Sequence, residues 1–165
     1  MSACTLLLKR VLLAAGASSC LAGCFGIPIS DVPLPGPRSA EVFVVREKVH
    51  VGSLISQFLS VDGVTIARLD NGEFTKFSVS EGAHTLRIQW RVPLHGPYVR
   101  TVRFEAQAGG KYLFVASAER APRVLGQREP DYSEGMSILQ WDWGDHDRKI
   151  EGKTYVPPGR GSSQL

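Results

Sequence analysis

The sequence predicts an all-β fold, either an antiparallel β-sandwich or a partly open barrel of about seven strands. Short apolar or alternating runs recur at spacings of roughly ten residues, which is typical of such folds. Glycine-containing turn signals separate these runs, and no convincing helical period lies between them. A chain of 165 residues can hold one such domain with additional segments at its ends.

Turn signals divide the middle of the chain into strands. Asp62-Gly63 lies between two apolar runs and predicts a hairpin, because both central residues of that turn need positive φ. Asp70-Asn71-Gly72 repeats the hairpin signal, and Glu81-Gly82 and Gly109-Gly110 add further turns. The predicted strands are 42–45, 54–61, 64–69, 73–79, 84–92, 98–106 and 112–116, with a weaker candidate at 136–143.

The hydrophobic pattern indicates how deeply the strands are buried. Val42–Val45 and Tyr112–Ala116 are continuously apolar, which is typical of strands buried on both faces. We expect these two strands to be central and to pair, closing the domain at its two sequence ends. The strand at 84–92 alternates and should be half-buried, with Leu86, Ile88, Trp90 and Val92 on one face and Thr85, Arg87, Gln89 and Arg91 on the other.

Arginines gather on the outward face of the strands at 84–92 and 98–106. If the loop between these strands is symmetric, Arg87 faces Arg103, and Arg91 lies nearby on the same face. Like charges directly opposite each other are destabilising, so a compensating anion is expected. It is either an acid on a flanking strand, such as Glu73 or Glu105, or an external group such as a lipid phosphate, a peptidoglycan carboxylate or a partner's acidic patch. Arg87, Arg91 and Arg103 are therefore a candidate anion-binding face.

The tryptophans suggest two further contacts. The same symmetric loop would place Trp90 opposite Arg100, as a cation–π pair. Trp141-Asp142-Trp143 lies in a polar stretch, where tryptophans can anchor a partner or stack on carbohydrate. The alternative is that one of these two tryptophans fills the end of the sandwich core.

The first 23 residues have the three parts of a secretory signal. Lys9 and Arg10 precede the apolar stretch Val11–Leu21, which is too short to span a membrane because a spanning helix needs roughly 20 residues. Small residues, Ala22 and Gly23, then precede Cys24. This order predicts export and cleavage.

The motif Leu21-Ala22-Gly23-Cys24 resembles the lipobox of bacterial lipoproteins. The resemblance implies that the Cys24 thiol receives a diacylglycerol, that the chain is cut before Cys24, and that the new amino group is acylated. Phe25 in place of Asp resembles outer-membrane sorting. The alternative is an ordinary cleaved signal in which Cys24 has no special role. Cys4 and Cys20 would leave with the leader, so the mature domain would have no disulfide.

A second resemblance covers about residues 41–118. Val61-Asp62-Gly63, Asn71-Gly72-Glu73-Phe74 and the turn at 80–86 are similar to an uncharacterised family of small bacterial lipoprotein domains. Its motifs are "V-D-G", "N-G-x-aromatic" and "P-G-x-H-T", and Arg46 would be its opening arginine. The chain departs from the family at Glu81, where the family usually has Pro. The resemblance implies a β-sandwich and a lipid anchor, and no known activity.

These signals predict five segments. Prolines and glycines in the second segment predict an extended, PPII-like spacer that holds the domain some distance from the membrane. The segments are a signal peptide at 1–23, the lipidated cysteine and Pro-rich tether at 24–40, the β domain at 41–118, an extension at 119–153 and a disordered tail at 154–165.

Composition and motifs do not favour catalysis or nucleic-acid binding. Without Lys9 and Arg10, the 19 basic residues fall to 17 against 16 acidic ones, so no concentrated basic charge is expected. The only cluster of metal-ligand types is best interpreted as a solvated acidic loop; it consists of Asp142, Asp145, His146 and Asp147. His84 should bond turn carbonyls. We predict no catalytic residue, no metal ligand and no cofactor.

The sequence therefore favours an outer-membrane lipoprotein whose domain lies in the periplasm. Exposure of the domain at the cell surface is the alternative location. It would be a non-catalytic binding or assembly module. Its partners would be the membrane, through the lipid, and an envelope protein or peptidoglycan. The alternatives are an envelope hydrolase or metal-dependent enzyme, and a structural or stress-related anchor lipoprotein.

Overall fold

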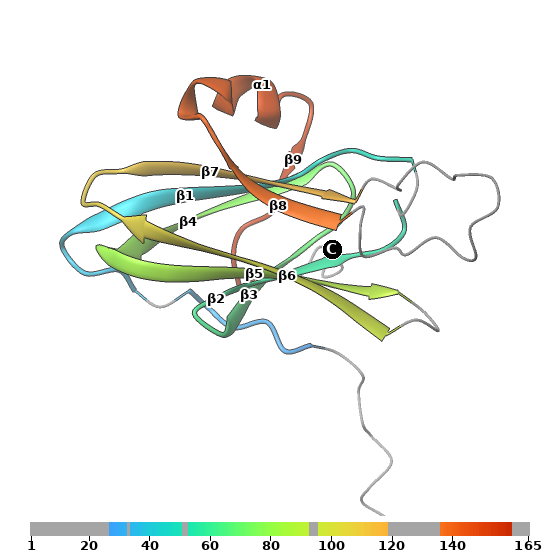
Figure 1. Cartoon of the computed structure of the whole chain (residues 1–165), viewed down its shortest axis with the longest axis horizontal. Coiled ribbons are helices and arrows are strands. Elements are labelled where there is room, and N and C mark those ends of the chain that lie inside the picture. Colours follow the sequence, from blue (N-terminus) through green and yellow to red (C-terminus); the bar gives the residue numbers. More distant parts are fainter. Residues whose placement is uncertain (1–26, 33, 51–52, 93–95, 119–135, 160–165) are drawn as a thin grey trace, which may run out of the picture.

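Two β-sheets face each other in the structure, a computed structural model that describes residues 27–32, 34–50, 53–92, 96–118 and 136–159 (Figure 1). The predicted all-β sandwich is confirmed. The signal segment and the motif Leu21–Cys24 lie outside the described residues. None of the helices among the described residues has the length and apolar character needed to cross a membrane.

The strand order assigns each element to one sheet. Sheet A has the order β8-β7-β1-β4-β9, and sheet B has the order β3-β2-β5-β6. The strands are β1 (Ser39–Arg46), β2 (Gln57–Val61), β3 (Val64–Leu69), β4 (Glu73–Ser80), β5 (Gly82–Val92), β6 (Gly96–Ala106), β7 (Lys111–Ala118), β8 (Met136–Trp141) and β9 (Thr154–Tyr155). A 3-10 turn, η1 (Trp143–Asp145), and a short helix, α1 (His146–Ile150), follow β8.

The two fully apolar runs are central neighbours, as predicted. Val44 of β1 pairs with Phe114 of β7, but the two strands are parallel, so the expectation of an antiparallel sheet is wrong here. Both strands start at the same end of the sandwich. The Glu41 N–H donates to Gly110 O over 2.9 Å there, and the Gly109 N–H donates to Ser39 O over 2.8 Å.

Two apolar clusters explain why β1 and β7 are apolar at almost every position. The first fills the space between the sheets and includes Trp90 and Phe114, which are completely buried. The second lies on the outer face of sheet A, beneath η1 and α1 (Figure 1). Its buried residues are Phe43, Val45, Leu113 and Val115. Each central strand thus faces sheet B on one side and the helical cover on the other.

The two aspartate–glycine turns have different roles. Asp62 and Gly63 have φ of 49° and 85°, and they join the antiparallel strands β2 and β3, so the predicted hairpin is confirmed. The turn at Asp70-Asn71-Gly72 joins β3 of sheet B to β4 of sheet A, so the hairpin predicted there is wrong. Asn71 clamps it to Val49, whose N–H donates to Asn71 Oδ1 and whose carbonyl accepts from Asn71 Nδ2.

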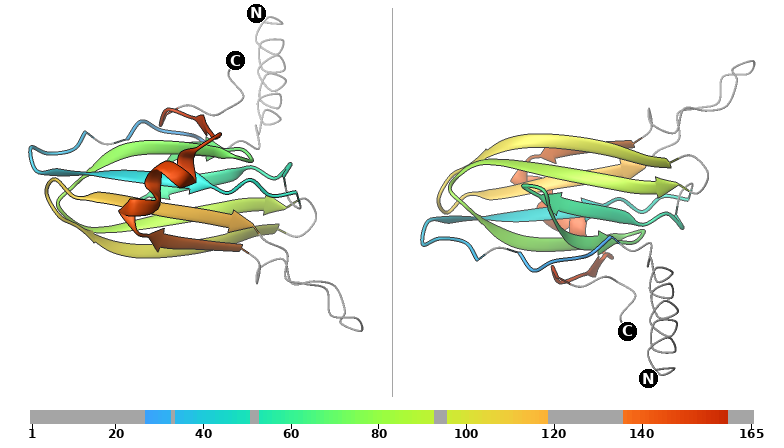
Figure 2. Two further views of the ribbon diagram at one scale, coloured as in Figure 1. Left: turned by 90° about the horizontal axis from the view of Figure 1, so that it is seen from above. Right: turned by 90° about the horizontal axis from the view of Figure 1, so that it is seen from below.

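Part of the predicted spacer lies on the domain. The Ser30 N–H donates to Thr65 O over 2.8 Å, and Val32 packs against the main core. Residues 27–32 run beside β3 (Figure 2). The part of the predicted spacer at 27–32 therefore contacts the domain. The physical reason is that β3 is an edge strand, whose backbone groups are available to a further segment.

The domain also extends beyond residue 118. The predicted strand at 136–143 is present as β8, which pairs with β7, but it ends at Trp141 and Trp143 begins η1. Residues 154–159, expected in a disordered tail, instead include β9, which pairs with β4 in parallel. Val156 is buried in the core, and its N–H donates to Phe74 O over 2.8 Å. This apolar contact explains why the expectation is wrong for 154–159, whereas 119–135 and 160–165 lie outside the described residues.

Candidate functional site

The outer face of sheet B carries four arginines, which we call the arginine face: Arg68, Arg87, Arg91 and Arg103. On β5, Leu86, Ile88 and Trp90 are fully buried in the core, so the intervening side chains point outward. Arg87, Arg91 and Arg103 are exposed, and Arg68 is half-buried. This face is the one turned toward the viewer in the right-hand view of Figure 2. The arginines predicted from β5 and β6 therefore do share one face.

The predicted pairing on this face is shifted by two residues. Arg87 pairs with Thr101, and Arg103 pairs with Thr85, so the prediction that Arg87 faces Arg103 is wrong. The pairing begins at Val92 and Gly96, which leaves a shorter connection than the symmetric loop assumed. Arg87 and Arg103 are diagonal neighbours, which lie about 7–8 Å apart in an antiparallel pair, and their repulsion is therefore weaker than that of directly opposite residues.

The same shift moves the partner of Trp90. Trp90 pairs with Tyr98, and Arg100 pairs with Ile88. The prediction that Trp90 lies opposite Arg100 is therefore wrong. The prediction that Trp90 shares the buried face of its strand with Leu86 and Ile88 is confirmed.

The arginine face has few acidic neighbours. Glu105 is on the outer side of β6, but Glu73 belongs to β4 in sheet A and does not flank this face. Within the part of the chain that the structure describes, no acidic side chain lies within 4.0 Å of Arg87 or Arg103. The guanidinium of Arg91 lies 5.9 Å from the ring centroid of Phe58. An external anion can therefore reach two exposed guanidinium groups.

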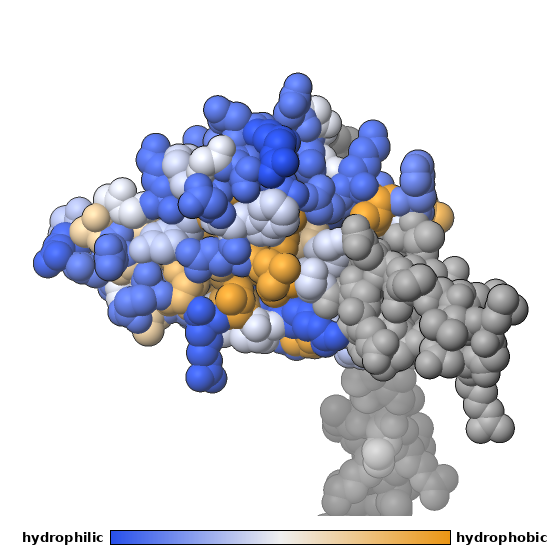
Figure 3. Space-filling view, turned by 45° about the horizontal axis from the view of Figure 1, so that its top comes forward, coloured by the Kyte–Doolittle hydropathy of each residue, from blue (hydrophilic) through white to orange (hydrophobic). Residues whose placement is uncertain are grey.

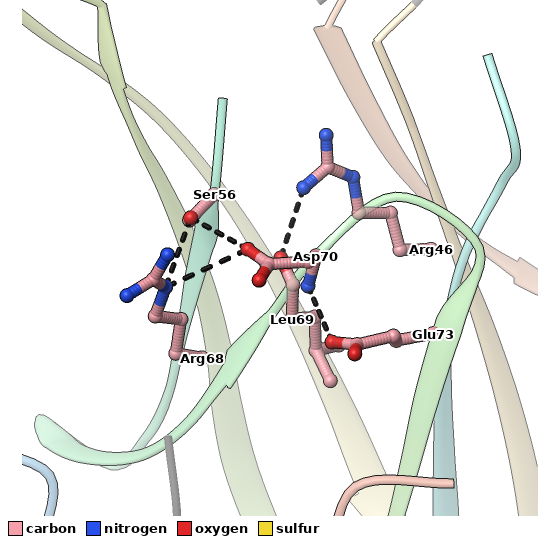
Figure 4. Close-up of polar contacts among 6 residues, drawn as sticks. All are labelled: Arg46, Ser56, Arg68, Leu69, Asp70 and Glu73. Carbon is pink, nitrogen blue, oxygen red and sulfur yellow. Dashed lines mark hydrogen bonds and ion pairs between the residues drawn. The ribbon is translucent and has the colours of Figure 1, made fainter. Parts of the chain in front are cut away.

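Arg68 belongs to a polar network around the turn between β3 and β4 (Figure 4). Ser56 Oγ donates to Asp70 Oδ1 over 2.6 Å, and Arg68 Nε donates to Ser56 Oγ over 2.9 Å. Arg68 Nε also lies 3.5 Å from Asp70 Oδ1. The sequence did not single out Arg68. In strict alternation Arg68 would share a face with Val64 and Ile66. A register shift in the β2–β3 pairing instead places it opposite Phe58 on the outer face.

Arg46, the opening arginine of the resemblance, is fully buried at the end of β1. Its Nη1 donates to Leu69 O over 2.9 Å, which joins sheet A to sheet B. Burial lowers the pKa of Arg46, while the charges of Asp70 and Glu73 act in the opposite direction. Because an arginine titrates far above neutral pH, the group remains cationic inside the sandwich. Its position indicates a structural role.

His84 contacts two turns. The predicted contact with a turn carbonyl is present at Ser80, and the sequence analysis did not predict the second contact, with the Asp62 carboxylate. Its Nε2 lies 2.8 Å from Ser80 O, and its Nδ1 lies 2.7 Å from Asp62 Oδ2. Both neighbours are acceptors, so only the doubly protonated ring can donate to both. Burial alone would lower the pKa of His84, but the bonds to Asp62 and Ser80 and the charges of Asp62 and Glu105 raise it overall.

This arrangement predicts a pH-dependent stability. A raised pKa in the folded state means that the contribution of His84 is complete below the unfolded value of about 6.5 and is lost as the pH rises through the folded value. We expect urea unfolding to show a loss on the order of 1 kcal/mol between the two limits. His84→Gln should remove this pH dependence. A wild-type stability that rises over the same interval would contradict the assignment.

The C-terminal tryptophans cover the outer face of sheet A. Trp143 stacks on His146, with ring centroids 4.2 Å apart, and both contact the ring of Phe43. Lys149 Nζ lies 3.7 Å from the ring centroid of Trp141. Neither tryptophan fills the end of the main core as one interpretation expected, because both pack on the second cluster. Both indole rings are thus engaged in contacts within the chain, whereas a partner anchor would present its ring to the solvent.

The acidic loop around η1 uses its side chains locally. Asp142 Oδ1 accepts from the Gly144 N–H over 2.7 Å, Arg148 bridges to Asp145, and His146 lies 2.9 Å from Asp147 Oδ1. Among the described residues, no group of three or more His, Cys, Asp and Glu side chains could hold a metal ion. The side chains of this loop therefore make local contacts, and Asp142 caps η1.

The fold and the arrangement of charges define a class, an all-β sandwich with one sheet face covered by a helical segment and the other basic. Comparisons of the chain with models of protein families, with curated proteins and with solved structures give no match.

Proposed function

We propose that this protein is a lipid-anchored lipoprotein of the bacterial envelope, with its sandwich in the periplasm and its anchor in the outer membrane. The sandwich acts as a non-catalytic binding or assembly module, and its binding surface is the arginine face. The anchor is supported by the lipobox-like motif Leu21-Ala22-Gly23-Cys24. The resemblance to small lipoprotein domains supports the same assignment.

The observation that carries the binding role is the exposure of Arg87 and Arg103 without an acidic partner among the described residues. A guanidinium group presents a planar set of donors that matches phosphate and carboxylate groups. Two such groups on neighbouring strands form a surface for an anionic partner. The rigid β5–β6 pairing holds them at a fixed spacing.

The anchor is tested with the full chain expressed from its own leader in a bacterium that has an outer membrane. We expect mass spectrometry to find a mature protein that starts at acylated Cys24. Cys24→Ser should abolish the acyl mass and the membrane retention, whereas the matched leader variant Cys20→Ser should change neither. A mature chain that starts at unmodified Phe25 would rule out the anchor.

The binding face is tested with the mature protein in nonionic detergent on a phosphate-bearing cation-exchange matrix. We expect Arg87→Gln/Arg103→Gln to elute at clearly lower salt than Lys76→Gln/Lys111→Gln. The two variants lose the same charge, but the lysines lie on the outer side of sheet A. Coelution of the two variants would show that net charge alone governs binding, and the face would then have no special role.

A further inference from the structure

The docked segment at 27–32 limits how far the domain can be from its anchor. Three peptide units separate Cys24 from Ile27, and each spans at most about 3.6 Å. Whatever conformation residues 24–26 adopt, the Cys24 Cα therefore lies within about 11 Å of the Ile27 Cα. Ser30 is bound to Thr65 and Val32 packs on the core, so Ile27 is held at the domain surface. An acyl chain on Cys24 would bring the domain directly to the lipid headgroups.

The docked segment at 27–32 adjoins the arginine face. Residues 27–32 run beside β3, which is the edge strand of sheet B and carries Arg68 on its outer side. The right-hand view of Figure 2 shows this segment at the border of sheet B. A membrane that holds Cys24 can therefore extend along the outer face of sheet B without any rearrangement of the domain.

Charge distinguishes the two sheets. The charged residues on the outer side of the sheet B strands are the four residues of the arginine face and one acid, Glu105. The cover of sheet A at 142–151 has four acids and two bases, and its surface is hydrophilic on the α1 side (Figure 3). An anionic surface attracts the first face and does not attract the second.

We propose that the arginine face lies flat against the anionic phospholipid headgroups of the leaflet that holds Cys24. This inference rests on the lipid anchor of the proposed function. It names the anion as the phosphate group of membrane lipids rather than a soluble partner. The lipid chains supply the attachment, and the arginines set the orientation of the domain, because acyl chains alone do not select a face.

The orientation is tested with the mature acylated protein in vesicles. Thr101→Cys places a thiol on the exposed outer side of sheet B, opposite Arg87, and Lys76→Cys places one on the outer side of sheet A, opposite Phe43. Each introduced thiol is the only free one, since Cys4 and Cys20 leave with the leader and Cys24 carries the lipid. Each variant is labelled with a fluorophore, and quenching by a headgroup-bound quencher is measured.

In vesicles rich in phosphatidylglycerol, we expect the label at position 101 to be quenched several-fold more than the label at position 76. The difference should shrink in pure phosphatidylcholine and in high salt. Arg87→Gln/Arg103→Gln should abolish it, whereas Lys111→Gln/Arg148→Gln, which removes equal charge from the opposite side, should not.

Flotation separates the two proposals. If the protein floats with the vesicles but both labels are quenched equally, the anchor stands and the flat orientation is wrong. Stronger quenching at position 76 would also overturn the orientation. An unchanged difference in the double arginine variant would overturn the role of the arginines. A protein that does not float lacks the anchor, and both proposals then fail.

Discussion

Replacing Trp90 with alanine is expected to lower the free energy of unfolding by about 3–5 kcal/mol. Trp90 is completely buried between the sheets, where it pairs with Gln57 of β2 and Tyr98 of β6. Its removal leaves a cavity in a packed core that has no disulfide among the described residues to support it. Urea unfolding followed by circular dichroism measures the change.

Two matched variants separate the burial of Trp90 from a general loss of aromatic surface. Trp90→Phe keeps a ring in the core and should cost clearly less than alanine. Trp143→Ala should also cost less, because Trp143 is only half-buried on the outer face of sheet A. If Trp143→Ala proved the more harmful substitution, the helical cover rather than the intersheet core would dominate stability. Trp90→Phe keeps the comparison measurable if the alanine variant does not fold.

The strands could be predicted from the sequence because their signals are local. Alternation identifies β5 from residues that are adjacent in the chain, and Asp62-Gly63 identifies its turn through the positive φ that it requires. Continuous apolar character identified β1 and β7 as buried on both faces. The second of those faces is covered by η1 and α1. Both elements are too short to produce a helical pattern in the sequence, so the sequence analysis did not predict them.

The features that differ from prediction depend on contacts between distant residues. A turn signal such as Asp70-Asn71-Gly72 fixes a reversal of the chain but does not say whether the next strand stays in the same sheet. Register on the arginine face depends on the length of one loop, so a small error shifts every partner by two residues. The docking of residues 27–32 depends on an open edge at β3, which the composition of the tether does not reveal.

The burial of Arg46 was also not predicted. In the sequence Arg46 follows an apolar run, and in the structure it is fully buried inside the sandwich. A buried guanidinium loses its hydration, and that cost is recovered only through its contacts. Nη1 supplies one such contact by donating to Leu69 O across the two sheets. The charges of Asp70 and Glu73, which belong to the adjoining turn, supply electrostatic support.

Arg46→Ala is therefore expected to lower the free energy of unfolding by about 3–5 kcal/mol. The substitution leaves Leu69 O without its side-chain donor, removes the cation that faces two acids, and opens a cavity at the end of the core. Arg46→Met should recover part of this loss, because an apolar chain of similar length refills the volume. Urea unfolding gives the magnitude, and amide exchange locates the change at the turn between β3 and β4.

Arg38→Ala is the matched control, because Arg38 also pairs with an acid but does so at the surface. Its Nε lies 2.8 Å from Glu81 Oε2, and the two side chains are 72% and 39% exposed. Exposed pairs contribute about 0–1 kcal/mol, so this variant should unfold close to the wild type. A cost for Arg46→Ala no larger than that of Arg38→Ala would mean that the guanidinium reaches water. The link between the two sheets through Leu69 would then be dispensable, and the stability of that end of the sandwich would rest on apolar packing alone.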